Sequence, residues 1–534
     1  MKYSGIIFND EVCAVRTKIR KEIRTMKKAT RILAFLLACL MLSAVLVACN
    51  DAKENGEDTT NAQGSTNTPS GTTGGDDGVQ VEKPVASDKY EDDFQFLIMN
   101  DIFRTDFFYA QEQTQEVMNN AIYTRQEQVY DEIGVTVLGK THTNYLEYKT
   151  DFEVSIKAGD GLYESCLTHT NVGVADMVTQ GLLADFNEME KINLDQPYWN
   201  KDLMETLALN GEMYLGYGDF CLASTYVIAY SKTLIERYCG TALGDNDIYD
   251  LVENYQWTLD KMIELASMSY EDKVAGSKDP SETYGIAGFL WVPAISFVHS
   301  SGIDICEYNS TKKTYEFSFA NPTNTKKMED LVSKIKELYS AEYSYFWGPF
   351  DAIGADPSKQ VNLKGKNTLF SITGTYGLID YVDNNVDDFG VLPYPMWDEA
   401  QGEYRHLSWN GYIAIPYNVD DISGAEMVGD TLEFLGYYSA PVTEAFYEKL
   451  LGAQISESPD DADMLEIVWD TQVSDYGMAY STYDNAAMDT ILYSLPQCVL
   501  GVNGYSTFSG LWAKVKSDVT IDLRKLQAKK PANS

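Results

Sequence analysis

Phe94-Gln-Phe-Leu-Ile-Met99, then Val117 to Ile133, then Val135-Thr-Val-Leu138 are the stretches that decide the fold class of this chain. The first is a short apolar run that passes into polar Asn100 and Asp101, which predicts a buried strand followed by a loop. In the second, apolar residues recur at helical spacing, which predicts a helix with one face inward. Strand, helix and strand in this order predict a βαβ unit and therefore a parallel sheet.

The same alternation continues along the chain. Further strands are predicted at 163–169, 213–215, 226–230, 284–289, 368–373, 389–392 and 412–415. Further helices are predicted at 172–180, from Trp257-Thr258 through Met268 with Thr258 as N-cap, and at 328–339, 424–451 and 460–473. A mixed α/β body with no nucleotide fingerprint and no fixed repeat predicts two α/β lobes. A ligand would lie between them, beyond the carboxyl ends of strands.

Composition excludes several classes of function. The chain has 41 Lys and Arg against 80 Asp and Glu, and residues 1–48 hold 9 and 3 of these. The remainder is therefore strongly acidic, with 32 basic against 77 acidic residues. Such a surface repels nucleic acid and anionic lipid, so we expect no nucleic-acid partner. Hydrophobic residues make up 44% and aromatic residues 12% of the chain, which indicates a globular protein rich in tyrosine.

The first 48 residues have the pattern of a secretory signal. Lys27, Lys28 and Arg31 precede an apolar run from Ile32 to Val47, which is short for a membrane span of about 20 residues. A plain signal peptide or an N-terminal membrane helix is the alternative. The run ends at Leu46-Val47-Ala48-Cys49, which resembles the lipobox of bacterial lipoproteins. The sequence thus predicts a signal peptide at 1–48, with Met26 as an alternative start. It also predicts lipidation of Cys49, with palmitate as one of the acyl groups, and anchoring on the extracellular face of the cell membrane.

Residues 49–90 are expected to be the lipidated cysteine and a disordered tether. They are rich in small and polar residues and cannot bury enough apolar surface to offset their ordering entropy. A flexible segment of about 40 residues has a root-mean-square span of roughly 35 Å. It would hold a globular body away from the membrane.

Cysteine usage gives no metal or redox site. Five cysteines follow Cys49, and they are scattered along the chain with no C-x-x-C spacing: Cys166, Cys221, Cys239, Cys306 and Cys498. Buried free thiols are the favoured interpretation, with one disulfide as the alternative. We expect no cofactor and no metal.

Several segments of the body occur in an informative order: Asn120-Ala-Ile-Tyr-Thr-Arg125, Leu194-Asp-Gln-Pro-Tyr-Trp-Asn-Lys-Asp202, Asn210-Gly-Glu-Met-Tyr214 with Gly218-Asp219, Tyr230-Ser-Lys-Thr-Leu-Ile235, Trp257-Thr-Leu-Asp-Lys-Met262 with Thr283-Tyr-Gly285, and Phe389-Gly-Val-Leu-Pro-Tyr-Pro395. Together they resemble family 1 extracellular solute-binding proteins of the clostridial, Gram-positive type. The segment around Lys278-Asp-Pro-Ser-Glu282 lacks an acidic loop often seen in that family, so no calcium site is carried over. The stretch after Thr170 also diverges.

The resemblance implies a two-lobed type II periplasmic-binding-protein fold with hinge-connected lobes and an interlobe ligand cleft. We expect lobe 1 at 91–222 plus 365–425 and lobe 2 at 223–364 plus 426–534. The implied function is capture of a small polar solute, a mono- or oligosaccharide, for an ABC importer. The expected partners are the solute and the permease subunits, with the protein itself a monomer and not an enzyme.

Candidate ligand residues are those placed at predicted strand ends, because aromatic faces pack on sugar rings and polar side chains bind hydroxyls. They are Asn100, Asp101, Thr170, Asn171, Asp219, Trp291, Tyr376, Trp409, Asn410 and Gly411. Trp409 and Trp291 are the best placed for stacking. For each tryptophan, packing in a lobe core is the competing interpretation, and Asp219 has the alternative of capping a turn beside Gly218.

Two other functions remain open. Glycoside hydrolysis needs only two carboxylates, so a secreted glycan-active enzyme is the main alternative. Other catalytic patterns are absent: there is no H-E-x-x-H or G-x-S-x-G, and the S-x-x-K at Ser310 and Ser333 have no K-T-G partner. A surface adhesion lipoprotein is the second alternative, and it would need no interlobe cleft.

Overall fold

The computed structural model describes residues 81–99, 107–142, 144–169, 173–219, 221–222, 224–244, 246–273, 278–348, 360–384, 386, 389–409, 411–455, 459–482, 489–501 and 504–528. The predicted signal peptide and the lipidation of Cys49 lie outside these residues. Residues 1–71 and 72–534 are separate units, and the described residues all belong to the second. Among them, no helix combines the length and apolar character that crossing a membrane requires.

The first sheet has the strand order β12-β3-β1-β2. β1 (Asp92–Met99) pairs in parallel with β2 (Val135–His142) and with β3 (Ser165–Thr168), whereas β12 (Tyr412–Ala414) pairs antiparallel with β3. The predicted βαβ unit and parallel sheet are thus confirmed. In β1, Phe94, Phe96, Leu97 and Ile98 are all buried, as expected for a parallel strand covered on both faces.

Helix α2 (Val117–Ile133) has the predicted bounds. The Glu116 side chain caps its first turn by accepting a hydrogen bond from the Asn119 amide at 2.7 Å. Gly134 ends the helix with φ 72°, a left-handed conformation that glycine adopts without strain. The chain therefore turns directly from α2 into β2.

Shorter elements complete this part of the chain: α3 (Tyr145–Ala158), α4 (Val174–Thr179), the 3-10 helix η3 (Phe186–Glu188) and α5 (Lys201–Thr206). The helix predicted at 172–180 is confirmed as α4, whereas α3 and α5 were not predicted. The strand predicted at 213–215 is wrong. No strand forms there, and the neighbouring Gly216 pairs with Ile413 only through an isolated bridge.

The second sheet has the order β13-β11-β4-β9-β5-β8, and β10 also pairs with β4. Its strands are β4 (Ser224–Ser231), β5 (Tyr284–Phe289), β8 (Ser344–Trp347), β9 (Thr368–Gly374), β10 (Phe389–Leu392), β11 (His406–Trp409) and β13 (Gln472–Val473). β5 is parallel to β8 and β9, while β4 is antiparallel to β9, β10 and β11. The strands predicted at 226–230, 284–289, 368–373 and 389–392 are confirmed.

Helices of this region are α6 (Lys232–Leu243), α7 (Ile248–Glu253), α8 (Leu259–Ser267), α9 (Trp291–Ser300), α10 (Pro322–Ser340) and α11 (Thr375–Asp383), with a hairpin of β6 (Cys306–Asn309) and β7 (Thr314–Phe317). Thr258 caps α8 as predicted, because its hydroxyl accepts from the Lys261 amide at 3.2 Å. α10 begins before its predicted start, with Asn321 as N-cap and Pro322 in the first turn.

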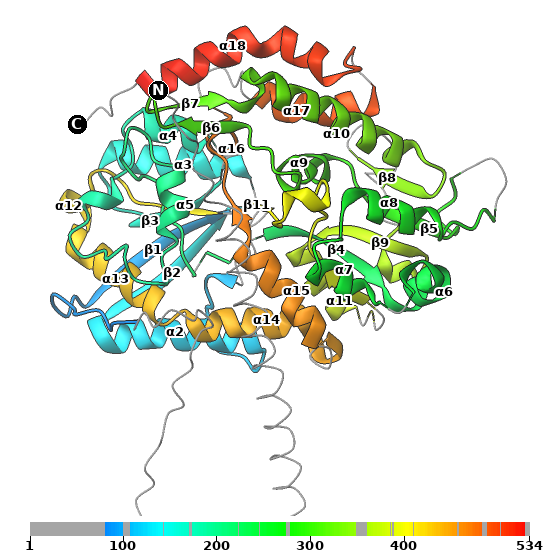
Figure 1. Ribbon diagram of the computed structural model, residues 1–534. Helices are drawn as coiled ribbons and strands as arrows, with labels where there is room; N and C mark the ends of the chain where they lie inside the picture. Colours follow the sequence, from blue (N-terminus) through cyan, green and yellow to red (C-terminus); the bar gives the residue numbers. More distant parts are fainter. Residues whose placement is uncertain are drawn as a thin grey trace, which may run out of the picture. The chain divides into compact units, whose positions relative to one another are not determined.

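The C-terminal part is helical: α12 (Val419–Ile422), α13 (Ala425–Tyr437), α14 (Ala440–Ile455), α15 (Pro459–Asp470), α16 (Tyr476–Ala479), α17 (Asp489–Leu500) and α18 (Phe508–Ala528). The single helix predicted at 424–451 is two helices, since Pro441 cannot continue a helix but fits the first turn of a new one. The helix predicted at 460–473 ends at Asp470, and Gln472 and Val473 join the sheet. α17 and α18 pack against α10 (Figure 1).

The strand pairing differs from the predicted division at 365–425. β9, β10 and β11 belong to the second sheet, because β4 offers hydrogen-bonding edges to all three, and the chain returns to the first sheet only at β12. α13, predicted in lobe 2, packs against α2. Hydrophobic pattern gives strand positions but not which sheet a strand joins, and this is where the predicted bounds differ from the structure.

The predicted tether, 49–90, overlaps a segment that is held against the folded body. The Ser87 amide and the Tyr90 hydroxyl both donate to one carboxylate oxygen of Asp430, each at 2.7 Å, and the Tyr90 amide donates to the Ile133 carbonyl at 2.8 Å. Residues 81–90 therefore contact α13 and the end of α2. The polar composition of residues 81–90 gave no indication of these contacts in the sequence.

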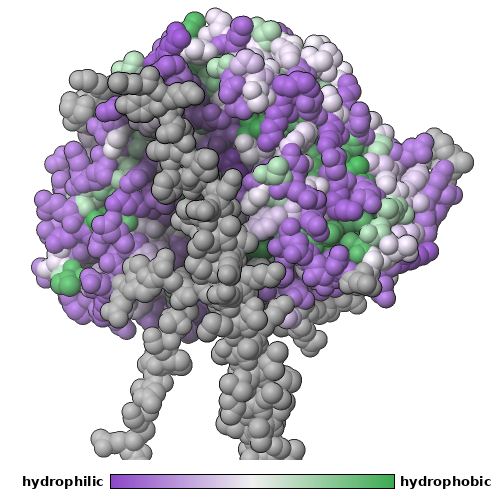
Figure 2. All heavy atoms as spheres, viewed as in Figure 1, coloured by the Kyte–Doolittle hydropathy of each residue, from purple (hydrophilic) through white to green (hydrophobic). Residues whose placement is uncertain are grey.

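All five predicted mature cysteines are buried and free, so the favoured interpretation of these thiols is confirmed. Burial raises the pKa of the Cys166 and Cys221 thiols to about 12, which leaves both as unreactive neutral groups. Hydrophilic side chains cover most of the visible described surface, with hydrophobic residues in scattered groups (Figure 2).

Candidate functional site

Two antiparallel connections join the sheets. Gly216 pairs with Ile413 of the first sheet, and Ser224 pairs with Trp409 of the second. Residues 217–219 and 221–222, which we call the crossing segment, therefore lie between these two pairings. The chain passes between the sheets at one place, although the two connections are almost 200 residues apart in sequence.

The ends of several strands point to this place. In the first sheet, β1 and β3 are parallel, so their carboxyl ends lie at the same edge, where β12 begins. In the second sheet, the carboxyl ends of β5, β8 and β9 share an edge with the start of β4. Edges of this kind bind ligands in open α/β sheets. We take them as the candidate site.

On the first edge, four of the predicted residues, Asn100, Asp101, Thr170 and Asn171, lie outside the described residues. Their neighbours Met99 and Thr168 end β1 and β3, so the strands that lead to them were predicted correctly. His169, which follows β3, is buried, and burial lowers the pKa of its imidazole to about 3. It is therefore a neutral side chain at this edge.

On the second edge, Trp291 and Tyr376 are not loop residues as predicted. Trp291 is the first residue of α9, two positions after β5, and it packs half-buried against the main hydrophobic core. Tyr376 lies in the first turn of α11, directly after β9. Both strands pass into a helix without an intervening loop, so these rings are fixed by helical backbone.

Tyr376 is engaged in packing. Its hydroxyl donates to the Leu222 carbonyl at 2.9 Å, and its ring meets Phe107 at 5.3 Å between centroids, with Phe446 of α14 at 6.4 Å. Phe107 lies in the segment before α2, and Leu222 belongs to the crossing segment. Tyr376 thus connects the crossing segment with Phe107 and with α14.

Asp219 lies in the crossing segment. Its amide donates to the Tyr198 carbonyl at 2.8 Å, and its carboxylate has no hydrogen-bond or ion-pair partner among the described residues. Burial alone raises the pKa of this carboxyl to about 7. Its charge is felt by the Tyr217, Cys221 and Tyr447 side chains. A half-buried carboxylate without a partner among the described residues is free to accept hydrogen bonds from a ligand, so Asp219 remains a candidate.

The other crossing residues are placed as follows. Trp409 is the last residue of β11 rather than a loop residue, and its side chain lies outside the described part. Asn410 also lies outside it. Gly411 is described and buried, immediately before β12. The pairing of Trp409 with Ser224 brings it and Gly411 beside the crossing segment that contains Asp219.

Sequence reasoning missed Gln472, which holds the crossing together. Its side-chain oxygen accepts from the Tyr217 hydroxyl at 3.3 Å and from Ser408 at 3.2 Å, and its amide donates to Thr225 at 3.2 Å. These partners come from the crossing segment, β11 and β4. A lone glutamine in a two-residue strand gives no sequence signal of such a role.

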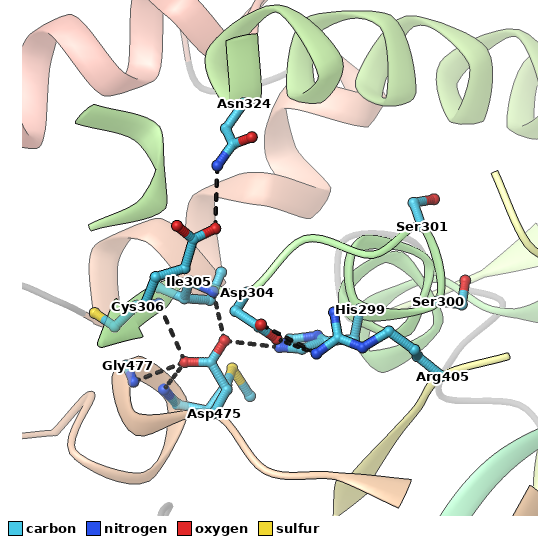
Figure 3. A network of polar contacts seen from close by, with 12 residues as sticks. His299, Ser300, Ser301, Asp304, Ile305, Cys306, Asn324, Arg405, Asp475 and Gly477 are labelled. Atoms are coloured by element: carbon cyan, nitrogen blue, oxygen red, sulfur yellow. Dashed lines mark hydrogen bonds and ion pairs between the residues drawn. The ribbon is translucent and has the colours of Figure 1, made fainter. Parts of the chain in front are cut away.

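A second polar group lies around Asp475 (Figure 3). His299, Asp304 and Asp475 place ligand atoms within 4.8 Å of one another, a spacing that could hold a metal ion. The oxygens are already engaged, however. Asp475 accepts from His299 at 3.0 Å and from the Gly477 amide at 2.7 Å, and Arg405 holds both oxygens of Asp304 at 2.9 and 3.0 Å. We interpret this group as a structural network.

A shallow surface hollow at the start of α2 is lined by Gln113, Thr114, Gln115 and Asn120. Asn119 and Asn120 use their side chains in hydrogen bonds to Thr114 and Gln113, so these amides are already engaged. The hollow therefore adds no ligand-binding group to the candidate site.

Comparison with known proteins identifies the fold. No protein-family model and no curated protein matches the chain. Solved structures do match, among them UgpB from Mycobacterium tuberculosis in complex with glycerophosphocholine, with a TM-score of 0.53, 13% identity, and coverage of 81% of this chain and 98% of that one. Lmo0181, an ABC substrate-binding protein from Listeria monocytogenes in complex with cycloalternan, matches with a TM-score of 0.50 and 14% identity. The match covers 82% of this chain and 100% of that one. The galacto-N-biose/lacto-N-biose I-binding protein from Bifidobacterium longum, in complex with lacto-N-biose, matches with a TM-score of 0.50 and 10% identity. The match covers 81% of this chain and 97% of that one.

These matches cover nearly the whole of each solved chain, and the Listeria and Bifidobacterium proteins are described as ABC substrate-binding or ABC-transporter proteins. The predicted fold class is confirmed: the chain has the two-lobed α/β fold of periplasmic binding proteins. The two sheets and the connections between them are the cores of the lobes and the hinge. At 10–14% identity the likeness concerns the fold.

Proposed function

We propose that this chain is the solute-binding protein of an ABC importer and that it captures a neutral saccharide between its lobes. The observation that carries the proposal is the meeting of two strand edges at the crossing, where Asp219 and Trp409 lie beside the hinge. The fold supports it, because two lobes joined by a hinge can close on a small ligand. The ligands of the solved neighbours support a hydroxyl-rich solute, either a saccharide or a glycerophosphodiester.

We further propose that the protein binds its solute without converting it and that it is a lipoprotein anchored through Cys49 on the outer face of the cell membrane. The permease subunits of the importer would be its other partners. Support for the anchor is the signal-like sequence before Cys49. Support for binding without turnover is that the structural neighbours are substrate-binding proteins.

The test is a thermal-shift screen of the purified protein against disaccharides (maltose, cellobiose, lactose and lacto-N-biose), cycloalternan, glycerophosphocholine, amino acids and polyamines. A ligand at 100 times its Kd should add about 2.7 kcal/mol of apparent stability. A shift with a saccharide, and recovery of that saccharide unchanged, would support the proposal. A shift only with glycerophosphocholine or an amine would retain solute binding and overturn the saccharide, and product formation would replace binding by catalysis.

A further inference from the structure

Residues 82–90, which we call the strap, lie on the surface of the body ahead of β1. Most of them are exposed, and only Ala86 and Tyr90 pack half-buried against the main hydrophobic core. A segment that buries so little apolar surface depends on specific polar contacts to offset its ordering entropy. The polar contacts of the strap therefore decide whether it belongs to the folded body or continues the tether.

The main polar contact of the strap is a buried carboxylate on α13. Asp430 is 2% exposed, and it accepts hydrogen bonds from the Ser87 amide and the Tyr90 hydroxyl, each at 2.7 Å. Among the described residues, these are the hydrogen bonds that its side chain has. A buried carboxylate is costly unless it is hydrogen-bonded, so loss of the strap would leave an unpaired charge in the core. Helix α13 thus carries a built receptor for the strap.

One turn further along α13, a second buried carboxylate holds a different segment. Glu433 accepts from the Asn193 amide at 3.1 Å, from the Tyr198 hydroxyl at 2.6 Å and from the Trp199 indole at 2.7 Å. These three partners belong to residues 193–200, which we call the pre-hinge segment. Helix α13 therefore binds the strap and the pre-hinge segment through carboxylates on the same helix, three residues apart.

The pre-hinge segment leads to the crossing between the sheets. The Asp219 amide of the crossing segment donates to the Tyr198 carbonyl at 2.8 Å. The strap reaches the same segment, because the Glu82 amide donates to the Gln196 side-chain oxygen at 3.2 Å. Gln196 is two residues from Tyr198, so the first residue of the strap lies close to the connection between the lobes.

The other end of the strap is fixed to α2. The Tyr90 amide donates to the Ile133 carbonyl at 2.8 Å, and the Lys89 amine donates to the Asp131 carbonyl at 3.1 Å. Both carbonyls belong to the last turn of α2, where the helix itself supplies no donors. Helix α2 packs against α13 and against β2 of the first sheet, so these contacts hold the strap to lobe 1.

We infer that the strap fixes the exit of the membrane tether to lobe 1, beside the hinge, so that lobe 2 closes on its solute without displacing the anchor. A point close to a hinge moves least when two lobes rotate about it. The inference rests on the proposed function for the anchor and for closure. The attachment of the strap is tested without either.

The experiment measures distances between spin labels by pulsed electron paramagnetic resonance. The full chain carries serine at Cys13, Cys39 and Cys49, and the five cysteines of the body are buried. Labels are placed at Val85→Cys in the strap and Val154→Cys on α3, where the native side chains are 87% and 57% exposed. Helix α3 packs on β1 and β2 of the first sheet.

Without saccharide, the inference predicts a single narrow distribution of the distance between these two labels. A free segment of about ten residues has a root-mean-square span of about 17 Å. A distribution with a width of that order in the otherwise unchanged protein would overturn the inference, because the strap would then be a continuation of the tether.

Asp430→Ala should broaden the distribution, since it removes the acceptor of Ser87 and Tyr90. Asp421→Ala is the matched control, because Asp421 is exposed on the neighbouring α12 and has no hydrogen bond to the strap. If Asp430→Ala does not fold, Ser87→Pro combined with Tyr90→Phe removes both donors and leaves α13 unchanged. A distribution as narrow as that of wild type in the folded variant would overturn the inference.

A second pair of labels tests which lobe moves. Met268→Cys replaces a side chain that is 39% exposed at the end of α8, which packs on β5 of the second sheet. On saturation with a bound disaccharide (maltose, cellobiose, lactose or lacto-N-biose), the distance from Val85→Cys to Met268→Cys should shift, and the distance to Val154→Cys should not. A shift in the second distance, or in neither, would overturn the inference. If no disaccharide binds, the proposed saccharide fails, and the widths measured without saccharide still decide whether the strap is attached.

Discussion

Replacing Asp219 by asparagine should stabilise the protein at neutral pH. The carboxylate lies in the crossing segment, half-buried, with no ion pair or hydrogen bond among the described residues. Burial raises the pKa of its carboxyl from 3.8 to about 7. The folded protein therefore binds this proton more tightly than the unfolded chain does, and the carboxylate destabilises the fold once it is ionised.

The size of the effect follows from the same values. A difference of about three pKa units corresponds to about 4 kcal/mol, which is an upper bound because water reaching the half-buried carboxylate would screen it. The sign is that of an acid with a raised pKa. Folding stability contributed by Asp219 is highest below about pH 4, falls as pH rises to about 7, and stays low above that. The asparagine side chain of the variant carries no charge, so this part of the pH dependence should disappear in Asp219→Asn.

Urea unfolding at pH 4, 5.5, 7 and 8 measures this pH dependence of the free energy of unfolding. We expect Asp219→Asn and wild type to agree at pH 4 and the variant to be more stable at pH 8, by a few kcal/mol at most. Asp518→Asn is the control, because the Asp518 side chain is exposed on α18. Equal slopes of stability against pH in wild type and Asp219→Asn would refute the reasoning and show that this carboxylate is hydrated in solution.

Three further variants test other parts of the structure. Asp475→Asn removes the carboxylate that binds His299 and several backbone amides, including that of Gly477, and should lower the free energy of unfolding by about 3–5 kcal/mol in urea titrations. A loss below about 1 kcal/mol would contradict the structural role of this network. Trp409→Ala should weaken saccharide binding by about 1–3 kcal/mol in isothermal titration if its ring contacts the solute, and unchanged affinity would remove it from the site. Cys49→Ser should move the full-length protein expressed in a Gram-positive host from the detergent phase to the aqueous phase on Triton X-114 partition, and retention in the detergent phase would contradict lipidation at this residue.

The sequence predicted the strands and helices whose apolar patterns are strong. α2 has the predicted bounds because its apolar spacing, its Glu116 cap and its terminal Gly134 all agree. The strand predicted at 284–289 is also confirmed, and Tyr284, Ile286 and Ala287 within it are fully buried. Such elements carry their own signal in consecutive residues.

Other elements depend on distant partners and were missed or misjudged. The segment 213–215 has the apolar character of a strand, yet it lies where only Gly216 and Ile413 pair. β13 is two residues long and exists because β11 lies beside it. Membership of β9 and β10 in the second sheet likewise depends on β4, far away in sequence. Local pattern cannot reveal partners of this kind.

The candidate site shows the same limit at the level of side chains. Asp219 and Gly411 lie at the crossing, and their part in ligand binding stays a prediction. The role of Gln472, however, depends on partners that come from three separate parts of the chain: Tyr217, Ser408 and Thr225. In sequence, Gln472 lies at the end of a predicted helix, and nothing near it indicates these contacts. A side chain that joins distant elements is therefore the kind that sequence reasoning misses and structure reveals.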